Sequence, residues 1–241
     1  MRLHDFRALT FDVYGTLIDW ETGIAEALQP WAERHGVEAG REALLEAFGA
    51  AESRRQQENP EMVYPEVLEL VFDDIARTFN VAPTPHEAAE FGASVEHWPA
   101  FPDSAPALAY LHQHYRLGII SNVDRVSFVF SNDKLGVTFD VVVTAEDARA
   151  YKPDPKPFHL ALERMSEIGI GHDAILHTAQ SLFHDHAPAR RLGLTSCWID
   201  RRQPLGGGWG ATPPPPAETQ PAFRFPSMEA LCEAHRGEAG G

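Results

Sequence analysis

Residues 9–17 read LTFDVYGTL, and this stretch decides how the chain folds. A mostly apolar run from Ala8 ends at Asp12, and Gly15 follows three residues later. A short apolar run that stops at turn residues predicts a buried β-strand followed by a sharp turn. Open α/β folds place their chemistry at the carboxyl ends of such strands, so we expect Asp12 at the functional edge of a sheet. The same pattern also fits an aspartate that only caps the turn.

The composition of the chain fits a globular protein with a small substrate. Its 241 residues, 44% of them apolar, suffice for a large core and a smaller insertion. Lys and Arg number 20 against 35 Asp and Glu, giving a net charge of −15. This charge repels nucleic acids and anionic membranes, and we exclude both as main partners. A small anionic substrate is compatible with it, because charges are screened over about 8 Å and a few local cations would hold the anion.

The cysteines and the N-terminus bear on the cellular compartment. Cys197 and Cys232 stand in apolar or helical contexts without a CxxC spacing, and we interpret both as packing residues in a reducing compartment. The N-terminal segment has no apolar signal region, and no run approaches the roughly 18 apolar residues that a membrane span needs. The sequence therefore predicts a soluble, cytoplasmic protein.

Residues 20–98 have the periodicity of helices. Apolar residues recur at helical spacing, and breaks fall at residues 36–40, 59–60 and 83–85. Thr84 is well placed to cap a helix that begins at Pro85. The pattern predicts a bundle of about four helices inserted after the first strand. Residues 1–19 and 99–241 would form the other domain.

After residue 99 the pattern changes to strands that alternate with helices. Strands are predicted at residues 117–121, 139–144, 174–178 and 195–199, with helices between them. This alternation indicates βαβ units, hence an α/β fold with a Rossmann-like parallel sheet flanked by helices. The Gly- and Pro-rich residues 204–221 are predicted to form a mobile surface loop. Residues 223–233 read as a short strand and a helix, with Ser227 as its cap.

The motif DxYGTL after an apolar strand resembles the first motif of the haloacid dehalogenase superfamily, in the form used by its 2-haloacid dehalogenases. The resemblance implies that Asp12 is a nucleophile and that residues 20–98 are a cap domain. Phosphatases of the superfamily carry a second Asp, the general acid/base, where this chain has Tyr14. We assign Tyr14 and Thr16 to substrate binding.

Ser121 and Asn122 end the predicted strand at residues 117–121. Their hydroxyl and amide groups can hold an anionic oxygen without titrating. The pair resembles the second motif of the superfamily, which implies that it binds the carboxylate or phosphate of the substrate. The same residues could instead cap the next helix.

Residues 151–158, YKPDPKPF, resemble the third motif. The resemblance implies that Lys152 lies beside Asp12, where a contact at about 4 Å is worth about 4 kcal/mol gross and keeps the nucleophile ionised. A solvated loop lysine is the alternative. The dehalogenases commonly have a Tyr six residues after this Lys, and Phe158, which we assign to the substrate pocket, stands there.

Residues 175–194, ILHTAQSLFHDHAPARRLGL, depart most from the family pattern. Dehalogenases place Ser, Asn and Asp here to orient the site and activate water, and Ser181 and Asp185 are the best matches in a segment one residue longer than usual. His184 is the alternative base. His184, Asp185 and His186 lack further ligands at fixed spacing, and we interpret them as helix-entry residues, one of them a base, and not as a metal site.

The resemblance also implies an arginine from the cap that holds the halide or the substrate carboxylate. Arg54 is the better match and Arg55 the alternative, although both could form ordinary helix salt bridges. Asp19 and Trp20, just after the first motif, are candidates for the mouth of the pocket.

Together these observations predict a 2-haloacid dehalogenase that needs no metal. Asp12 would displace halide from a short 2-haloalkanoate, and water activated by Asp185 or His184 would hydrolyse the ester. The segment CWIDR at residues 197–201 is also dehalogenase-like. Two alternatives stay open: a magnesium-dependent phosphatase of the same fold, and a non-catalytic binding module. The resemblance further suggests a homodimer formed through the cap, whereas halogen, chain length and enantiomer are left open.

Overall fold

Strand β1 (Ala8–Phe11) is central in a six-stranded sheet. The computed structural model describes residues 1–203, 211–214, 216 and 219–239. All strand pairs of the sheet are parallel, in the order β3-β2-β1-β4-β5-β6. The other strands are β2 (Arg116–Ser121), β3 (Val141–Thr144), β4 (Ile175–Ala179), β5 (Thr195–Ile199) and β6 (Phe223–Phe225). The predicted α/β fold is confirmed.

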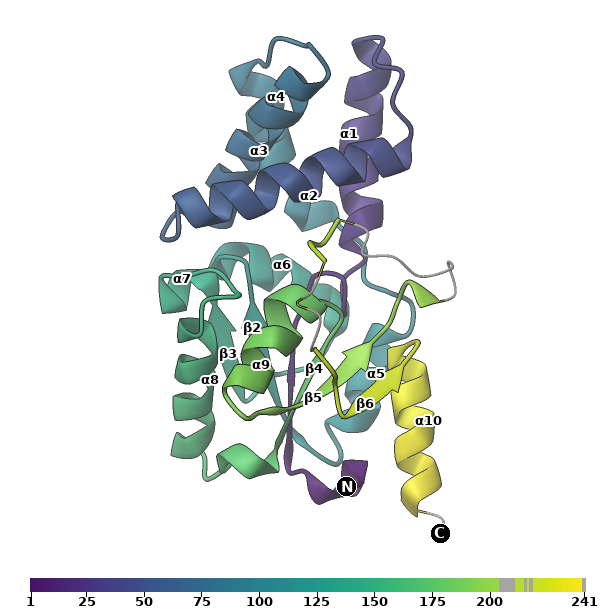
Figure 1. Cartoon of the computed structure of the whole chain (residues 1–241). Coiled ribbons are helices and arrows are strands. Elements are labelled where there is room, and N and C mark those ends of the chain that lie inside the picture. The colour runs from purple at the N-terminus through teal and green to yellow at the C-terminus, as the bar shows by residue number, and fades with distance from the viewer. Residues whose placement is uncertain (204–210, 215, 217–218, 240–241) are drawn as a thin grey trace.

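Helices cover both faces of this sheet (Figure 1). Because side chains alternate along a strand, Leu9 and Phe11 belong to one apolar cluster and Ala8 to another. The first face packs against α5 (Ser104–Leu111), α6 (Arg125–Leu135) and α10 (Met228–Ala239), and the second against α8 (Lys156–Glu167) and α9 (Ala187–Arg191). The short helix α7 (Ala145–Ala148) follows β3. Strand β1 is buried on both faces and is therefore held firmly up to Phe11, the residue immediately before Asp12.

The predicted helices between residues 20 and 98 are confirmed. They are α1 (Trp20–Arg34), α2 (Arg41–Glu58), α3 (Tyr64–Thr78) and α4 (Pro85–Ala93), followed by the 3₁₀ turn η2 (Ser94–His97). The Thr84 side chain accepts a hydrogen bond from the backbone N–H of Glu87, as the predicted cap requires. In Figure 1 these helices lie above the carboxyl edge of the sheet. We call residues 20–98 the cap and the remainder the core.

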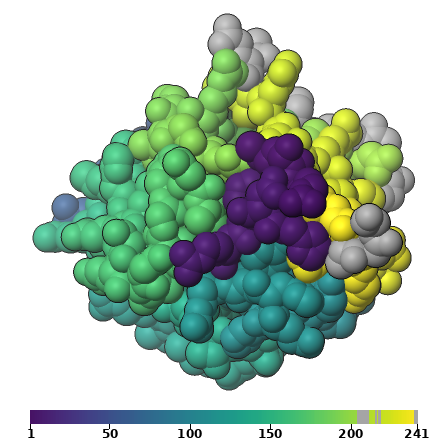
Figure 2. Space-filling model, turned by 90° about the horizontal axis from the view of Figure 1, so that it is seen from below, coloured from purple at the N-terminus to yellow at the C-terminus, as the bar shows by residue number. Residues whose placement is uncertain are grey.

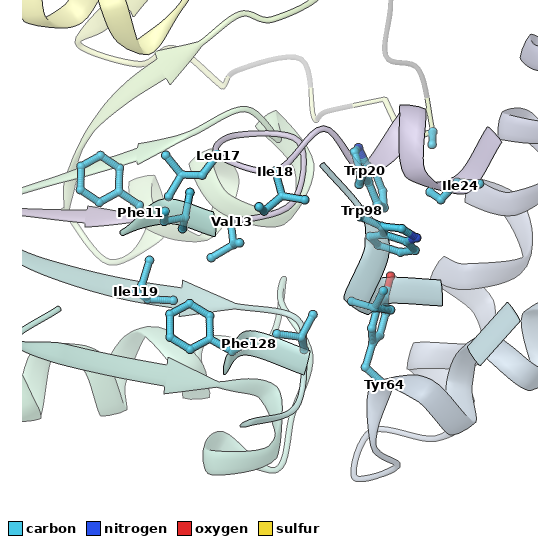
Figure 3. Close-up of a cluster of buried hydrophobic side chains, with 14 of the residues drawn as sticks. Phe11, Val13, Leu17, Ile18, Trp20, Ile24, Tyr64, Trp98, Ile119 and Phe128 are labelled. Atoms are coloured by element: carbon cyan, nitrogen blue, oxygen red, sulfur yellow. The ribbon is translucent and has the colours of Figure 1, made fainter. Parts of the chain in front are cut away.

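Two chain crossings join the cap to the core, and they pair with each other. Ile18 forms an antiparallel bridge with Ala100, and the Asp19 amide donates to the Pro99 carbonyl at 2.8 Å. Figure 3 shows that buried apolar side chains continue across this junction. They run from Phe11 in the sheet to Trp98 at the end of the cap, both at most 1% exposed. The crossings are therefore packed and not loosely tethered.

The two ends of the chain meet at the opposite edge of the molecule. Seen from below in Figure 2, the N-terminal residues lie beside the C-terminal part. Within this contact the 3₁₀ turn η1 (Leu3–Asp5) adjoins α10, and the amides of Leu3 and His4 donate to the Glu238 carboxylate. Another 3₁₀ turn, η3 (His172–Ala174), precedes β4.

Other predictions have mixed outcomes. Cys197 and Cys232 are free and buried, which confirms them as packing residues, and the Ser227 hydroxyl accepts the Ala230 amide at the start of α10, which confirms the predicted cap. The predicted mobile loop at residues 204–221 falls partly outside the described residues, at 204–210, 215, 217 and 218. Ala211, which is described, is 3% exposed and packs against Gly49 of α2, so this part is not a free surface loop. Across the described residues, the helices are too short or too polar to span a bilayer.

Candidate active site

A small cavity lies where the cap covers the carboxyl end of β1. Its volume is about 30 Å³, enough for an ordered water molecule. A larger pocket of about 320 Å³ shares Gln56, Lys152 and His184 with it. The residues that line the cavity are Asp12, Tyr14, Trp20, Glu52, Gln56, Tyr64, Asn122, Lys152, Ser181, His184, Asp185 and Thr212.

Asp12 is held at both carboxylate oxygens. Lys152 Nζ donates to Oδ1 at 2.8 Å, and Thr16 Oγ1 donates to Oδ2 at 2.7 Å. Thr16 Oγ1 in turn accepts the amide of Gln180 at 2.8 Å, which ties the first motif to the end of β4. The turn needs glycine at Gly15, whose φ is +91°. Thr16 itself is fully buried behind Asp12, so our assignment of Thr16 to substrate binding is corrected: its hydroxyl positions the carboxylate.

Lys152 joins two acidic side chains. Its ammonium donates to Asp12 Oδ1 at 2.8 Å, to Asp185 Oδ1 at 2.7 Å and to the Ile120 carbonyl at 2.8 Å. All three N–H groups are therefore used inside the protein. Burial alone would lower the pKa of Lys152, but the two carboxylates raise it above its usual value. The ammonium is thus a fixed positive charge.

Asp185 is the second carboxylate of this group. Besides Lys152, its Oδ1 is within 3.1 Å of His177 Nε2, while His177 Nδ1 is 3.0 Å from Thr10 Oγ1. Burial alone would raise the pKa of Asp185, but Lys152 and His177 lower it below its usual range. For Asp12, burial and the Asp185 charge outweigh Lys152 and raise the pKa. Within the described part of the chain, Asp185 Oδ2 is buried without a hydrogen-bond partner, which leaves it as an acceptor for a water molecule.

The segment that carries Asp185 is a π-helical turn, residues Leu182–His186. Ser181 begins it and accepts the backbone N–H of His184 at 3.0 Å, and the Ser181 hydroxyl lies 3.1 Å from His184 Nδ1. Burial lowers the pKa of His184 to about 4, so its imidazole is neutral near pH 7. His186 points away from the cavity and contacts the Ser196 hydroxyl and the Ala179 carbonyl.

The cap contributes a wall that the sequence did not indicate. Glu52 is 4% exposed, and its Oε1 accepts the hydroxyl proton of Tyr64 at 2.6 Å. Gln56, one helical turn further along α2, accepts from the Asn122 amide at 3.4 Å. The signal that could have revealed them is spacing, because both lie on the buried face of α2 that also carries Leu45 and Phe48.

Other predicted site residues fall into two groups. Tyr14 and Asn122 line the cavity; the Tyr14 hydroxyl bonds to Ser131 Oγ at 2.7 Å, and Asn122 Oδ1 accepts the Lys152 amide at 2.7 Å. Ser121 and Phe158 do not line it. Both are fully buried: Ser121 Oγ has no hydrogen-bond partner among the described residues, and the Phe158 ring packs edge-on against His177. Their assignment to substrate binding stays a prediction, and neither side chain lines this cavity.

The predicted cap arginines also lie outside the cavity. Arg54 and Arg55 both pair with Asp74 of α3, and the Arg54 side chain is 54% exposed. Arg54 lies about 200° around the helix from Glu52, on the other side of α2. Arg55 is nearer the face of Glu52, but its guanidinium is held by Asp74. Of the predicted mouth residues, Trp20 lines the cavity, whereas Asp19 caps α1 by accepting the Thr22 amide.

The side chains of the described residues bear on the metal alternatives. Within the described ranges, no group of three or more His, Cys, Asp or Glu is arranged to hold a metal ion. The cation that contacts both Asp12 and Asp185 is the Lys152 ammonium. Tyr14 has no charge to offer, because burial raises the pKa of its hydroxyl. What remains is a carboxylate pair with one ammonium, suited to nucleophilic attack and water activation.

Comparisons with known proteins show what the chain is similar to. A family model described as haloacid dehalogenase-like hydrolase matches residues 6–177. The haloacid dehalogenase-like hydrolase domain-containing protein 3 of Danio rerio is 32% identical over 109 residues, which is 44% of each chain. The (S)-2-haloacid dehalogenase H-109 of Pseudomonas putida is 24% identical over 225 residues, covering 88% of this chain and 93% of that protein.

The fold has solved counterparts as well. The L-2-haloacid dehalogenase of Xanthobacter autotrophicus, solved with chloropropionic acid covalently bound, superposes with a TM-score of 0.73. The match covers 96% of this chain and 99% of that one at 19% identity, so it is a likeness of fold.

Proposed function

The chain belongs to the haloacid dehalogenase-like hydrolases, and from this membership we propose that it hydrolyses short 2-haloalkanoic acids to 2-hydroxy acids through an ester on Asp12. The observation that carries the proposal is the contact of one ammonium, Lys152, with both Asp12 and Asp185 beside a cavity. Tyr14 stands where a phosphatase would need an acid/base, and a halide leaves without a proton.

The reaction has two steps. In the first, an Asp12 oxygen forms a bond to the carbon that bears the halogen, and the halide leaves with the bonding electrons. In the second, water attacks Cγ of the ester, and the bond between Cγ and the ester oxygen breaks. Asp185 Oδ2 accepts a hydrogen bond from that water, while neutral His184 is the alternative base. The alcohol oxygen of the product therefore comes from Asp12, and water restores the carboxylate.

The test is halide release from a panel of 2-chloro-, 2-bromo- and 2-fluoroalkanoic acids. We expect Asp12→Asn to reduce the rate at least about 10³-fold, because the nucleophile is lost. With enzyme in excess over substrate in ¹⁸O-labelled water, the first product should carry no label, and the peptide containing Asp12 should gain it. Label in the first product would contradict the ester. Magnesium-dependent hydrolysis of p-nitrophenyl phosphate without halide release would favour the phosphatase instead.

A further inference from the structure

The cap places an acidic side chain, Glu52, in the same cavity as Asp12. An anionic substrate bound there would need a positively charged or proton-donating group. Glu52 is 4% exposed. The Tyr64 hydroxyl donates its only proton to Glu52 Oε1 at 2.6 Å. Oε2 is thus the oxygen of this carboxyl that is left to meet a bound ligand.

The cavity has little other positive charge to offer. Lys152 is the one ammonium or guanidinium group among the described residues that line it, and its three protons are bonded to protein oxygens. An ionised Glu52 would add a third carboxylate to Asp12 and Asp185. At the distances of a closed cavity, such a charge would oppose any anionic ligand. A neutral Glu52 would instead have a hydroxyl proton to donate.

We propose that Glu52 is a specificity-determining residue that binds the anionic substrate in its protonated form, donating a hydrogen bond from Oε2 to the ligand. Binding of a small carboxylate then draws one proton from solvent whenever Glu52 is ionised in the free enzyme. The choice of a small carboxylate as ligand rests on the proposed function; the protonation of Glu52 does not.

The ionisation of Glu52 suits this role. Burial and the Asp12 charge raise the pKa of Glu52, and the hydrogen bond from Tyr64 lowers it. The net result is a pKa of about 7. The groups that face it from α3 and from the core are Asp12, Tyr14, Tyr64, Tyr151, Lys152, His184 and Asp185.

Most of these neighbours keep one charge state near pH 7. Burial lowers the pKa of His184 to about 4, and it raises the pKa of Tyr14. The two carboxylates raise the pKa of Lys152, despite its burial. The pKa of Asp12 is also raised, by burial first, so a variant of Glu52 is needed to separate the two acids.

The experiment measures binding of propionate, an unreactive carboxylate, by calorimetry between pH 6 and 8.5. In two buffers of different ionisation enthalpy, the wild-type protein should take up close to one proton per propionate at pH 8, and its Kd should rise about tenfold per pH unit above pH 7. Glu52→Gln keeps a donor and the Tyr64 contact but cannot titrate, so its Kd should stay constant. Glu58→Gln, an exposed acid of the same helix, is the matched control and should behave like wild type.

A second variant tests the same idea from the other side. Tyr64→Phe removes a hydrogen bond that lowers the pKa of Glu52, so the pH at which propionate affinity begins to fall should move upward. A wild-type Kd that does not change with pH, equal proton uptake in Glu52→Gln, or no propionate binding at pH 6 would each overturn the inference. Proton-linked binding without any halide release would contradict the proposed function alone. Halide release whose KM is independent of pH would contradict the role of Glu52 alone.

Discussion

Replacing Lys152 should lower the free energy of unfolding strongly. It is 2% exposed, and it compensates two buried carboxylates, Asp12 and Asp185. Lys152→Met would leave both without a cation, and removing one partner of a buried ion pair costs about 3–5 kcal/mol. Urea denaturation should show this loss in the free energy of unfolding. Lys156→Met, at an exposed lysine in the same segment, should change it by no more than about 0.5 kcal/mol. Equal losses of unfolding free energy in the two variants would mean that the ion pairs of Lys152 make no net contribution to stability.

Thr16 should influence the pH below which the reaction rate falls, which is the acid limb of the pH–rate profile. Asp12 must be ionised to attack, and burial raises its pKa above the ordinary value of 3.8, so the rate should fall with decreasing pH at a higher pH than for an ordinary aspartate. The Thr16 hydrogen bond lowers this pKa, and Thr16→Val should therefore move the acid limb of kcat to higher pH. The measurement is the initial rate of halide release from pH 4 to 9. A limb that moves to lower pH would argue against Asp12 as the titrating group.

Residues at strand ends could be predicted from the sequence, and residues fixed by cap packing could not. Asp12, Lys152 and Asp185 were singled out by their resemblance to motifs of the superfamily, and the structure brings all three to one cavity at the carboxyl edge of the sheet. His177 was missed because an imidazole inside a strand has no sequence signal that distinguishes it from packing. The spacing along α2 places Glu52 on the buried face of the helix, but local sequence does not determine which part of the core that face covers, and so Glu52 was missed.

Helix α2 shows how geometry along an element corrects an assignment made by motif. Arg54 is two residues beyond Glu52, about 200° around the helix, and faces α3. Arg54→Ala should therefore change kcat/KM less than about twofold and stability by no more than about 1 kcal/mol. Gln56→Ala, four residues beyond Glu52 and in the cavity, should raise KM. Steady-state kinetics with 2-chloropropionate compare the two. A larger loss of activity in Arg54→Ala than in Gln56→Ala would indicate that Arg54 contacts the substrate after all.

At the scale of the whole molecule, the junction between cap and core depends on one close approach. A Cβ on Gly23 of α1 would lie 2.3 Å from the Trp98 ring, which is 1% exposed. Gly23→Ala should destabilise the protein by about 1–3 kcal/mol and weaken substrate binding, because the ring must move. Thermal unfolding and KM measure the two effects. Gly237→Ala, in open space on α10, should instead stabilise by about 0.4–1 kcal/mol. Unchanged KM in Gly23→Ala would mean that the site tolerates a displaced cap.

The alternation of strands and helices in the sequence predicts the layers of the molecule, and the sheet confirms them. The order of the strands in the sheet could not be predicted from the sequence, because it depends on pairings between distant segments. The three-residue β6 at the sheet edge illustrates this, since its pairing with β5 brings together Cys197 and Phe223. The position of residues 211–212 against the cap was missed for the same reason: a Gly- and Pro-rich composition describes local conformation and not what the segment touches.

The central position of β1 has a consequence for biosynthesis. Ala8 is translated before both of its neighbours in the sheet, Arg116 and Ile175. The whole cap is translated in between, and its helices contact one another over short stretches of chain, so they can form while β1 still waits for both partners. The contacts of Asp12 with Lys152, and of Lys152 with Asp185, can therefore form only after residue 185 has been synthesised.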